Sequence, residues 1–493
     1  MTAVREQTVE RPAGSIERSA GIVEKTLNIR AAQFSLWRTI NRLGTENLPF
    51  VWLFIIYGFV AIPIFALLTP SYQVSDEIAH FLRADQVALG QWIGVRASPT
   101  QSGGIVDQSI SDSFNLFSPI ILHPERKVTA SILNHASAIH WDNVKSFREF
   151  DNTAIYPPFY YVVAACAIRL GKLTNMSVVR TLKVARLMNG AAAILLGAVA
   201  LVLAGSGAPW FFALLTLPMT LSEMASASQD ALLIPMAAIA AALFIRLLRE
   251  EFYDRIGFGV FCALLGLIAM GRITYITLAL LPLALSRYSL TARLFGCAAV
   301  TVAGLAWAWI ASRLVLVPFG LTGANAPEQI RRLLAHPSLI VPLIRNTMRY
   351  QWNLYIESFV GKLGWLDLKL PWSYIVLAVC DLAVAALACV TIATGRRRTM
   401  FYRIIVLIAL ITSIAGLFAA LYVSWTPVGN FIVDGIQGRY FIPLAFFLAA
   451  VIAIGEQPVL RPVATVCKLL VAAFPLITTP VVLLGIVSRY YLS

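Results

Sequence analysis

Residues 49–85 read PFVWLFIIYGFVAIPIFALLTPSYQVSDEIAHFLRAD, and this stretch decides the fold. Its first part, 49–68, is an apolar run of the length that an α-helix needs to cross a bilayer, about 20 residues. Pro70 ends the run, and the acid pair Asp76-Glu77 follows within a few residues. The stretch therefore predicts a membrane-spanning helix followed by a polar helix at the membrane surface.

The composition of the whole chain agrees with this prediction. The chain has 493 residues, of which 59% are hydrophobic and only 13% are charged, whereas soluble proteins carry about 25% charged residues. This excludes a soluble globular protein and a disordered one, and it predicts an all-α polytopic membrane protein with about 11 to 13 transmembrane helices. The net charge of +14 fits the positive-inside rule. No basic run is interleaved with aromatic residues, so nucleic acid is not expected as a partner.

The pattern of apolar and polar stretches divides the chain into four parts. We expect a cytoplasmic tail at 1–47 with an amphipathic helix, a transmembrane module at 48–317 that contains a first outer loop at 71–155 with interfacial helices, a second outer loop at 318–371, and C-terminal transmembrane helices at 372–493. The second transmembrane span is predicted near 156–171.

Loop charge predicts the orientation. Four basic clusters, at 169–186, 246–255, 287–293 and 396–403, are assigned to the cytoplasm by the positive-inside rule. This places the outer loops and the short segment 425–438 outside the cytoplasmic (inner) membrane. Because an even number of crossings must separate the first two clusters, one of 187–205 and 208–222 is expected to be a re-entrant or half helix. The count is then 11, with the N-terminus inside and the C-terminus outside.

The helix after the first span carries the strongest candidate site. Ser75 is the expected N-cap of this helix. Asp76, His80 and Arg83 then follow at positions i, i+4 and i+7, so their side chains share one face of the helix. An acid, an imidazole and a guanidinium beside the bilayer suit proton abstraction next to a bound phosphate. The alternative is an ordinary capped helix at the membrane surface.

Three further positions combine polar residues with helix ends. Tyr156 opens the motif YPPFYY (156–161), which suits either an interfacial aromatic belt or a substrate wall. Asp230 begins an apolar span, where it is either a helix cap or part of a cavity. Arg272 lies between two apolar stretches and is either a phosphate ligand or a snorkelling side chain.

The second outer loop ends in VGKLGWLDLKLPW (360–372), which mixes tryptophan with basic residues. Lys362 and Trp365 suit a headgroup surface or a platform on which a sugar ring stacks. The interfacial belt is the alternative, since Trp is enriched at membrane surfaces.

Arg439 begins another apolar stretch, within GIQGRYFIP (435–443). A cation at a helix start opposes the helix dipole unless an anion is present. We expect Arg439 to bind a lipid phosphate with Gln437 and Tyr440 nearby. The alternative is an ion pair with a buried carboxylate such as Asp434.

The sequence gives no pattern for a resident cofactor. No histidine pair has the spacing of a stable metal site, although Asp76 with His80 leaves room for a transient divalent cation. No phosphate-binding loop and no dinucleotide-binding motif is present, so a nucleotide substrate is not expected.

Four motifs carry a resemblance to known proteins: SDEIAHFLRADQVALG (75–90), YPPFYY (156–161), GKLGWLD (361–367) and GIQGRYFIPL (435–444). In this order they resemble the C-type (GT-C) glycosyltransferases, which include protein O-mannosyltransferases and the aminoarabinose transferase of lipid A. The chain is more closely similar to a bacterial family of membrane proteins that is named as a domain of unknown function. The resemblance covers nearly the whole chain after residue 48.

The resemblance implies an enzyme that moves a sugar from a polyprenyl phosphate to an envelope glycan, lipid or protein outside the membrane, with inversion of the anomeric centre. By the motif match, Asp76 would be the general base, with Glu77 in support or as a structural partner of a nearby arginine. The lipid phosphate would be held by Arg439, Arg272 and Arg83. The residues expected to contact substrate are His80, Tyr156, Asp230, Lys362, Trp365, Gln437 and Tyr440.

Two other classes of function stay open. A transporter or flippase of lipid-linked glycans would show an inverted repeat and ionisable residues at the bilayer midplane, and neither is evident. A non-catalytic envelope assembly protein would not need the acid and arginine residues at the membrane edge.

Overall fold

The computed structural model describes residues 47–249, 253–318, 323–390, 396–453 and 461–492. The predicted amphipathic helix of the N-terminal tail lies outside these ranges. In the described residues, seven helices are long and apolar enough to cross a membrane: Asn47–Leu68, Val178–Leu203, Asp230–Arg249, Leu290–Leu314, Trp372–Cys389, Met400–Ser424 and Pro462–Tyr490. Three shorter apolar helices are Arg255–Gly271, Ile273–Ala284 and Gly438–Ile452. The chain is therefore a mostly helical membrane protein, as the composition predicts.

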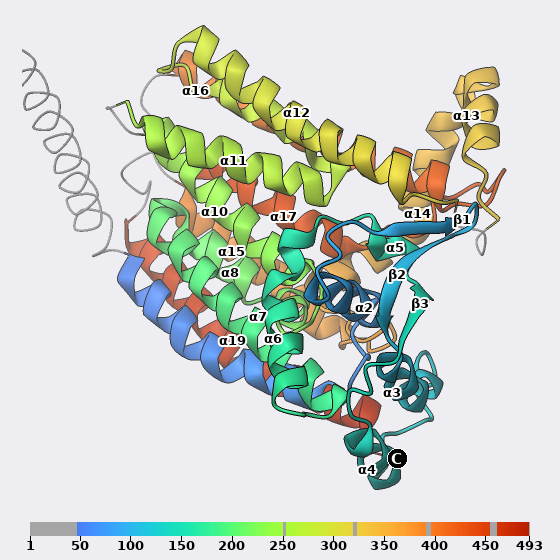
Figure 1. Cartoon of the computed structure of the whole chain (residues 1–493). Coiled ribbons are helices and arrows are strands. Elements are labelled where there is room, and N and C mark those ends of the chain that lie inside the picture. Colours follow the sequence, from blue (N-terminus) through green and yellow to red (C-terminus); the bar gives the residue numbers. More distant parts are fainter. Residues whose placement is uncertain (1–46, 250–252, 319–322, 391–395, 454–460, 493) are drawn as a thin grey trace, which may run out of the picture.

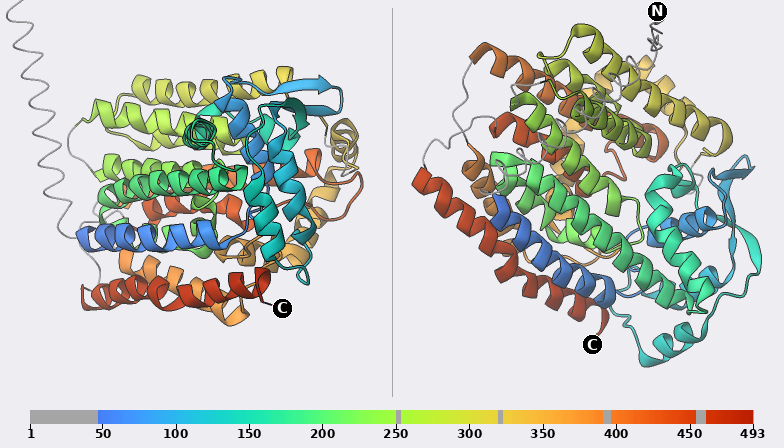
Figure 2. Two further views of the ribbon diagram at one scale, coloured as in Figure 1. Left: turned by 60° about the horizontal axis from the view of Figure 1, so that its bottom comes forward. Right: turned by 60° about the vertical axis from the view of Figure 1, so that its left-hand side comes forward.

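The helices lie side by side in one bundle, with a polar region at one end (Figures 1 and 2). Helix α7 packs against α6 and α10, α15 packs against α19 and α8, and η4 packs against both α12 and α16. The bounds of these elements are α6 Val162–Leu173, α7 Val178–Leu203, α8 Ala208–Leu215, α9 Pro218–Met224, α10 Asp230–Arg249, α11 Arg255–Gly271, η4 Ile273–Ala284, α12 Leu290–Leu314, α13 Ala326–Ala335, α14 Ile340–Val360, α15 Trp372–Cys389, α16 Arg396–Ser424, η7 Gly438–Phe441, α17 Ile442–Ala445, η8 Phe446–Leu448, α18 Ala449–Ile452 and α19 Arg461–Tyr490.

The polar region is built mainly from residues 71–155. It contains α2 Glu77–Ala88, β1 Val95–Ser98, β2 Gln101–Asp107, α3 Ser109–Phe117, η1 Ser118–Ile120, α4 Ala130–Ala138, β3 Lys145–Glu149 and α5 Asp151–Ala154. The strands form one antiparallel sheet in the order β1-β2-β3. Gly104 lies on β2, where a Cβ atom would come within 2.3 Å of the Gln86 side chain of α2. Glycine at this position therefore allows the sheet to pack on α2.

The prediction from loop charge that the clusters at 169–186 and 246–255 lie on the same side of the membrane is wrong. Lys172 pairs with Asp85 of α2 at 2.6 Å, and Arg186 pairs with Glu77 at 2.5 Å. These cations therefore lie at the polar end of the bundle. Arg249 donates to Ala453 and lies beside Gly205, just beyond the other end of α7. The clusters at 169–186 and 246–255 are thus at opposite ends of the bundle.

The predicted span near 156–171 is also not found. Helix α6 has 12 residues, which is about 18 Å at 1.5 Å per residue and too short to cross a bilayer. It packs on α2 and α7 instead. The segment 187–205 is part of the continuous helix α7, whereas 208–222 is divided between the short helices α8 and α9, with Pro218 at the start of the second. The break falls in this region as the sequence predicted, but the re-entrant helix was inferred from both basic clusters lying on one side, which their positions at opposite ends of the bundle contradict.

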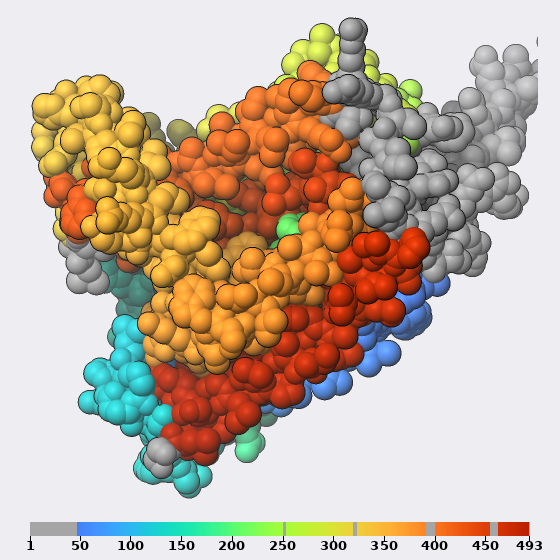
Figure 3. Space-filling view, turned by 180° about the vertical axis from the view of Figure 1, so that it is seen from behind, coloured from blue at the N-terminus to red at the C-terminus, as the bar shows by residue number. Residues whose placement is uncertain are grey.

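The segment Gly438–Ile452 is divided into η7, α17, η8 and α18 and packs inside the bundle. Helix α18 contacts both α15 and α16. Seen from behind, the bundle is hollowed between α15 and α16, both orange, and redder atoms from later in the sequence are visible in the hollow (Figure 3).

Candidate active site

A cavity of about 610 Å³ lies where the polar region meets the bundle. Its polar wall includes Asp76, Asp230, Arg272 and Arg439, and its apolar wall comes from α12 and α16. The acid and the arginines that the sequence singled out at three separate helix ends are therefore brought to one cavity.

Asp76 has an unusual backbone conformation that turns its side chain away from helix capping. It is the N-cap residue of α2, at φ 62° and ψ 4°, and its carboxylate makes no capping hydrogen bond. The prediction of Ser75 as the N-cap is thus wrong by one residue. The left-handed conformation is strained for most residues but tolerated by aspartate. It places the Asp76 carboxylate at the cavity instead of over the helix N-terminus.

The Asp76 carboxylate has two partners from distant parts of the chain. Its Oδ1 accepts from Asn152 Nδ2 at 3.3 Å, and its Oδ2 pairs with Arg439 Nη2 at 3.0 Å. The Asp76 side chain is 32% exposed, whereas the side chains of Glu223 and Asp230 are 2% and 7% exposed. Asp76 is therefore the most accessible of the three carboxylates, and the one that a substrate in the cavity can reach most readily.

Arg439 links two carboxylates and is almost fully buried. Its Nη1 donates to Glu223 Oε1 at 2.6 Å while its Nη2 contacts Asp76. The alternative that the sequence left open, a pair with a buried carboxylate, is therefore found, with Glu223 as the partner; Asp434 instead accepts from Asn430 at 2.7 Å. The segment is fixed by Gly438, where a Cβ atom would lie 2.0 Å from the carbonyl oxygen of Tyr355. Only glycine allows this approach to α14.

Arg272 forms the second ion pair at the cavity. Its Nη2 contacts both carboxylate oxygens of Asp230, at 2.8 and 2.6 Å. Its guanidinium also lies 4.4 Å from the ring centre of Tyr440, and the Arg439 guanidinium lies 5.5 Å from the same ring. The Tyr275 hydroxyl donates to the carbonyl of Tyr440 at 2.5 Å. Tyr440 is therefore held in contact with both arginines.

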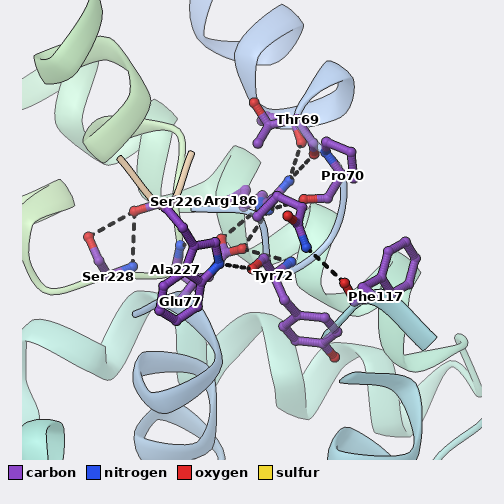
Figure 4. Close-up of polar contacts among 12 residues, drawn as sticks. Thr69, Pro70, Tyr72, Glu77, Phe117, Arg186, Ser226, Ala227 and Ser228 are labelled. Carbon is purple, nitrogen blue, oxygen red and sulfur yellow. Dashed lines mark hydrogen bonds and ion pairs between the residues drawn. The ribbon is translucent and has the colours of Figure 1, made fainter. Parts of the chain in front are cut away.

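Glu77 is held in a buried ion pair away from the cavity. It is fully buried and makes two contacts with Arg186, at 2.7 and 2.5 Å. Arg186 also donates to the carbonyls of Thr69 and Pro70 at the end of the first span (Figure 4). Glu77 is not among the cavity-lining residues. The structural partnership with an arginine, which the sequence left open, is confirmed.

Arg83 and Lys362 also lie away from the cavity lining. Arg83 is fully buried and donates to the carbonyls of Trp92 and Tyr156, at 2.7 and 3.1 Å. Lys362 pairs with Glu357 at 3.1 Å. Arg83 therefore fixes the backbone at Tyr156, which does line the cavity, and neither cation is placed to hold a phosphate there.

His80 faces the cavity as a neutral side chain. Its Nδ1 lies 2.8 Å from the Tyr161 hydroxyl, and its ring stacks on Tyr156 with 6.1 Å between ring centres. Burial, together with the positive charges of Arg439 and Arg272, lowers the pKa of His80 to about 3. His80 can therefore act as a neutral hydrogen-bonding wall near neutral pH.

Trp365, in the segment predicted as the second outer loop (318–371), lines the cavity. Its Nε1 donates to the carbonyl of Tyr72 at 2.9 Å, and its backbone N–H donates to Asp367 at 3.1 Å. Asp367 is held in turn by Arg489 at 2.6 Å. Gln437 lines the same cavity.

Sequence reasoning missed three contributors to the cavity and gave only a weak signal for a fourth residue beside it. Asn152, the partner of Asp76, lies in a helix of four residues that gave no pattern. Gln229 precedes Asp230 but gave no signal of its own, and Trp307 lies within an apolar span, where the sequence offers no polar pattern. Glu223, which is buried beside the cavity, follows a short apolar run and gave only a weak signal.

Among the described residues, no group of three or more His, Cys, Asp or Glu side chains is arranged to hold a metal ion. The carboxylates at the cavity are instead occupied by Arg439 and Arg272. The chemistry that these residues can perform is proton transfer by Asp76 and charge stabilisation by the two arginines.

Comparison with protein families gives one match. The model of a family described as a predicted membrane protein, DUF2142, matches residues 59–448, which is most of the chain. Neither the search of curated proteins nor the search of solved structures found a match. The matched range includes Asp76, Arg272 and Arg439. The chain therefore belongs to the DUF2142 family of predicted membrane proteins.

Proposed function

We propose that this protein is a membrane glycosyltransferase that moves a sugar from a polyprenyl-phosphate donor to an envelope acceptor. The observation that carries the proposal is the cavity itself. It holds a reachable carboxylate, Asp76, and two arginines at one wall, and membrane-spanning helices form the opposite wall. A proton acceptor, cations for a leaving phosphate and an apolar wall are the three things that such a reaction needs.

The apolar wall supports a lipid-linked substrate. It is lined on α12 by Gly304, Trp307, Ala308 and Ala311 and on α16 by Leu417, Ala420 and Leu421. Only 17% of the most apolar window of α12 and 28% of that of α16 is buried inside the protein. Because these helices have most of their surface on the outside of the bundle, an isoprenoid chain in the membrane could reach the cavity between them.

The proposed reaction uses one proton transfer and one displacement. The Asp76 carboxylate takes the proton of an acceptor hydroxyl while that oxygen attacks the anomeric carbon of the donor sugar. The bond from the anomeric carbon to the phosphate oxygen breaks, and its electron pair leaves with polyprenyl phosphate. Arg439 and Arg272 stabilise the charge that develops on the leaving phosphate. Attack from the face opposite the phosphate inverts the anomeric centre.

The ion pairs suggest how a donor would be accommodated. Arg439 is shared by Asp76 and Glu223, so an incoming phosphate competes with Asp76 for one edge of the guanidinium. Glu223 can retain the other edge and keep Arg439 in place. Donor binding would thereby release the Asp76 carboxylate for the acceptor hydroxyl.

We place this cavity on the outer side of the cytoplasmic membrane. The opposite end of the bundle carries the basic clusters at 246–255 and 287–293, which lie close together because Tyr288 donates to the carbonyl of Asp254 at 2.7 Å. Short basic loops favour the cytoplasm. Counting α8 with α9 as one crossing, and the three shorter apolar helices as one each, gives 11 crossings. Ile273–Ala284 has 12 residues, as α6 does, but it is a 3-10 helix, so at about 2.0 Å per residue it extends about 24 Å.

The test is transfer by the purified protein in reconstituted vesicles. Decaprenyl phosphate carrying radiolabelled mannose, glucose, arabinose or N-acetylglucosamine is supplied as the donor, and a cell-envelope fraction supplies acceptors. The proposal expects label to move from at least one donor to the acceptor fraction, with release of decaprenyl phosphate. Movement of intact donor across the vesicle membrane without transfer would overturn it in favour of a flippase.

A further inference from the structure

Gln229 has an unusual combination of burial and unused hydrogen-bonding capacity. It is 1% exposed and lines the cavity, yet neither Oε1 nor Nε2 has a hydrogen-bond partner among the described residues. Two neighbours in the cavity wall share this feature, since Gln437 Oε1 and Arg439 Nε are also buried without a partner there. Three residues that line one cavity therefore each carry a buried polar atom without a partner among the described residues.

A buried glutamine elsewhere in the chain shows what is usual. Gln329 is fully buried, and its Nε2 donates to the carbonyls of Tyr422, Thr426 and Pro427, each at 3.2 Å. Buried polar groups nearly always find such partners, because leaving them unpaired costs stability. The Gln229 amide departs from this rule at a cavity wall, which points to a ligand as its partner.

The backbone of Gln229 is held at the start of α10. The Gln229 carbonyl accepts from the N–H groups of Leu232 and Leu233, at 3.1 and 3.0 Å, in the first turn of α10. The next residue, Asp230, is held by Arg272. Gln229 therefore lies at a hydrogen-bonded helix start, next to an ion pair in which Asp230 and Arg272 neutralise each other.

We propose that Gln229, together with Gln437 and the Nε of Arg439, forms a subsite for the hydroxyl groups of a sugar ring. An amide offers one acceptor and two donors, and a hydroxyl group both donates and accepts. Neighbouring hydroxyls of a ring can therefore satisfy Oε1 and Nε2 at once, which a purely anionic or apolar ligand cannot. The assignment of the ring to a transferred or accepting sugar rests on the proposed function; the binding of a hydroxylated ring does not.

Binding is tested first without any transfer. Thermal unfolding of the full chain in detergent is measured with the methyl glycosides of mannose, glucose and arabinofuranose at millimolar concentration, and separately with citronellyl phosphate. We expect at least one glycoside to raise the Tm of the wild type and to have no effect on Gln229→Met. Citronellyl phosphate, which lacks a sugar, should raise the Tm of both proteins equally. Equal glycoside protection of the wild type and of Gln229→Met, or none in either, overturns the proposal.

A matched pair of variants separates a binding role from a structural one. Gln229→Met replaces an unpartnered amide with an apolar side chain of similar shape, so the Tm without ligand should stay equal or rise. Gln329→Met should lower the Tm, because it leaves three carbonyls without their donor. A fall in Tm for Gln229→Met as large as that for Gln329→Met would show that Gln229 has a structural partner.

Transfer then identifies the source of the ring. With a donor that the wild type uses, removal of the contacted hydroxyl from the donor sugar should lower kcat/KM by about tenfold or more, and Gln229→Met should show no such discrimination. If only deoxy acceptors discriminate, the ring belongs to the acceptor. Failure of every donor while glycosides still protect only the wild type refutes the proposed function and leaves the subsite. Active transfer with unchanged discrimination in Gln229→Met refutes the subsite alone.

Discussion

Arg439 pairs with Asp76 across 3.0 Å, although 363 residues separate them in the chain. Asp76 follows the first span, and Arg439 begins a short apolar helix near the end of the chain. The same guanidinium reaches Glu223 at 2.6 Å. One buried arginine thus joins three parts of the sequence at the cavity, and its removal should affect both the fold and the site.

Arg439→Gln should lower stability strongly. It leaves the Glu223 carboxylate buried without its cation, and removal of one partner of a buried pair costs about 3–5 kcal/mol. The double variant Arg439→Gln with Glu223→Gln should recover much of the lost Tm in detergent, because no uncompensated charge remains. Transfer should stay absent in both variants. A double variant no more stable than Arg439→Gln would show that the pair is not the source of the loss.

The backbone of Asp76 allows a test of its conformation. At φ 62°, alanine is strained by about 1–2 kcal/mol, whereas glycine adopts this region freely. Asp76→Gly should therefore be more stable than Asp76→Ala when the two are compared by thermal unfolding. Both lack the carboxylate, so both should be inactive. The opposite order of stability would contradict the left-handed conformation.

Glu77→Gln should lower the free energy of unfolding and leave the rate of sugar transfer unchanged. The Arg186 guanidinium is fully buried, and loss of its counter-charge should cost about 3 kcal/mol or more. Transfer per folded molecule, measured after size-exclusion chromatography, should remain close to wild type. Glu328→Gln is the matched control: it removes the exposed pair with Arg331, and exposed pairs contribute about 1 kcal/mol or less. A folded but inactive Glu77→Gln protein would give Glu77 a role in catalysis.

His80 should make the protein less stable in mild acid. Its pKa is about 3 in the folded protein and about 6.5 in an unfolded chain. As the pH falls below about 6.5, the unfolded state binds a proton that the folded state does not, so stability is lost; by pH 5 the loss is about 2 kcal/mol. His80→Asn should flatten the dependence of Tm on pH between 7 and 5. An equal slope in the two proteins would mean that His80 protonates in the folded state.

Sidedness can be tested with single cysteines in a background that lacks the six native ones. Leu173 is 86% exposed beside the cluster at 169–186, and Tyr253 is 47% exposed at the other end of the bundle. A membrane-impermeant maleimide should label Leu173→Cys in intact cells and Tyr253→Cys only after permeabilisation. The reverse pattern would place the cavity in the cytoplasm.

The sequence predicted the membrane fold and the main parts of the cavity because these depend on local patterns. Apolar runs show spans directly. Placing an ionisable residue in a membrane segment costs free energy, so such a residue at the end of a span indicates a functional site. Asp76, Arg272 and Arg439 were found in this way. Asp230, the partner of Arg272, was found in the same way, but the pairs of Asp76 with Asn152 and of Arg439 with Glu223 were not, because contacts between distant segments form them and no local pattern records such contacts.

The prediction that the basic clusters at 169–186 and 246–255 share one side failed for a physical reason. The positive-inside rule counts cations, but Lys172 and Arg186 have carboxylate partners in the first polar segment. A cation that is neutralised by a carboxylate partner is weaker evidence for the cytoplasmic side than an unpaired cation is. The span predicted near 156–171 failed for a related reason: one apolar face of α6, which includes Ala164, Ala167 and Ile168, is buried in a helix that packs on α2 and α7.

The most direct test of the central claim compares wild type, Asp76→Asn and Asp76→Glu in transfer from decaprenyl-phosphate sugars in vesicles. Asparagine keeps the size and the left-handed conformation but cannot accept the proton. We expect Asp76→Asn to fold with an unchanged elution profile and to lose transfer by about 100-fold or more, with Asp76→Glu retaining partial activity. Transfer by folded Asp76→Asn at the wild-type rate would contradict the assignment of Asp76 as the base.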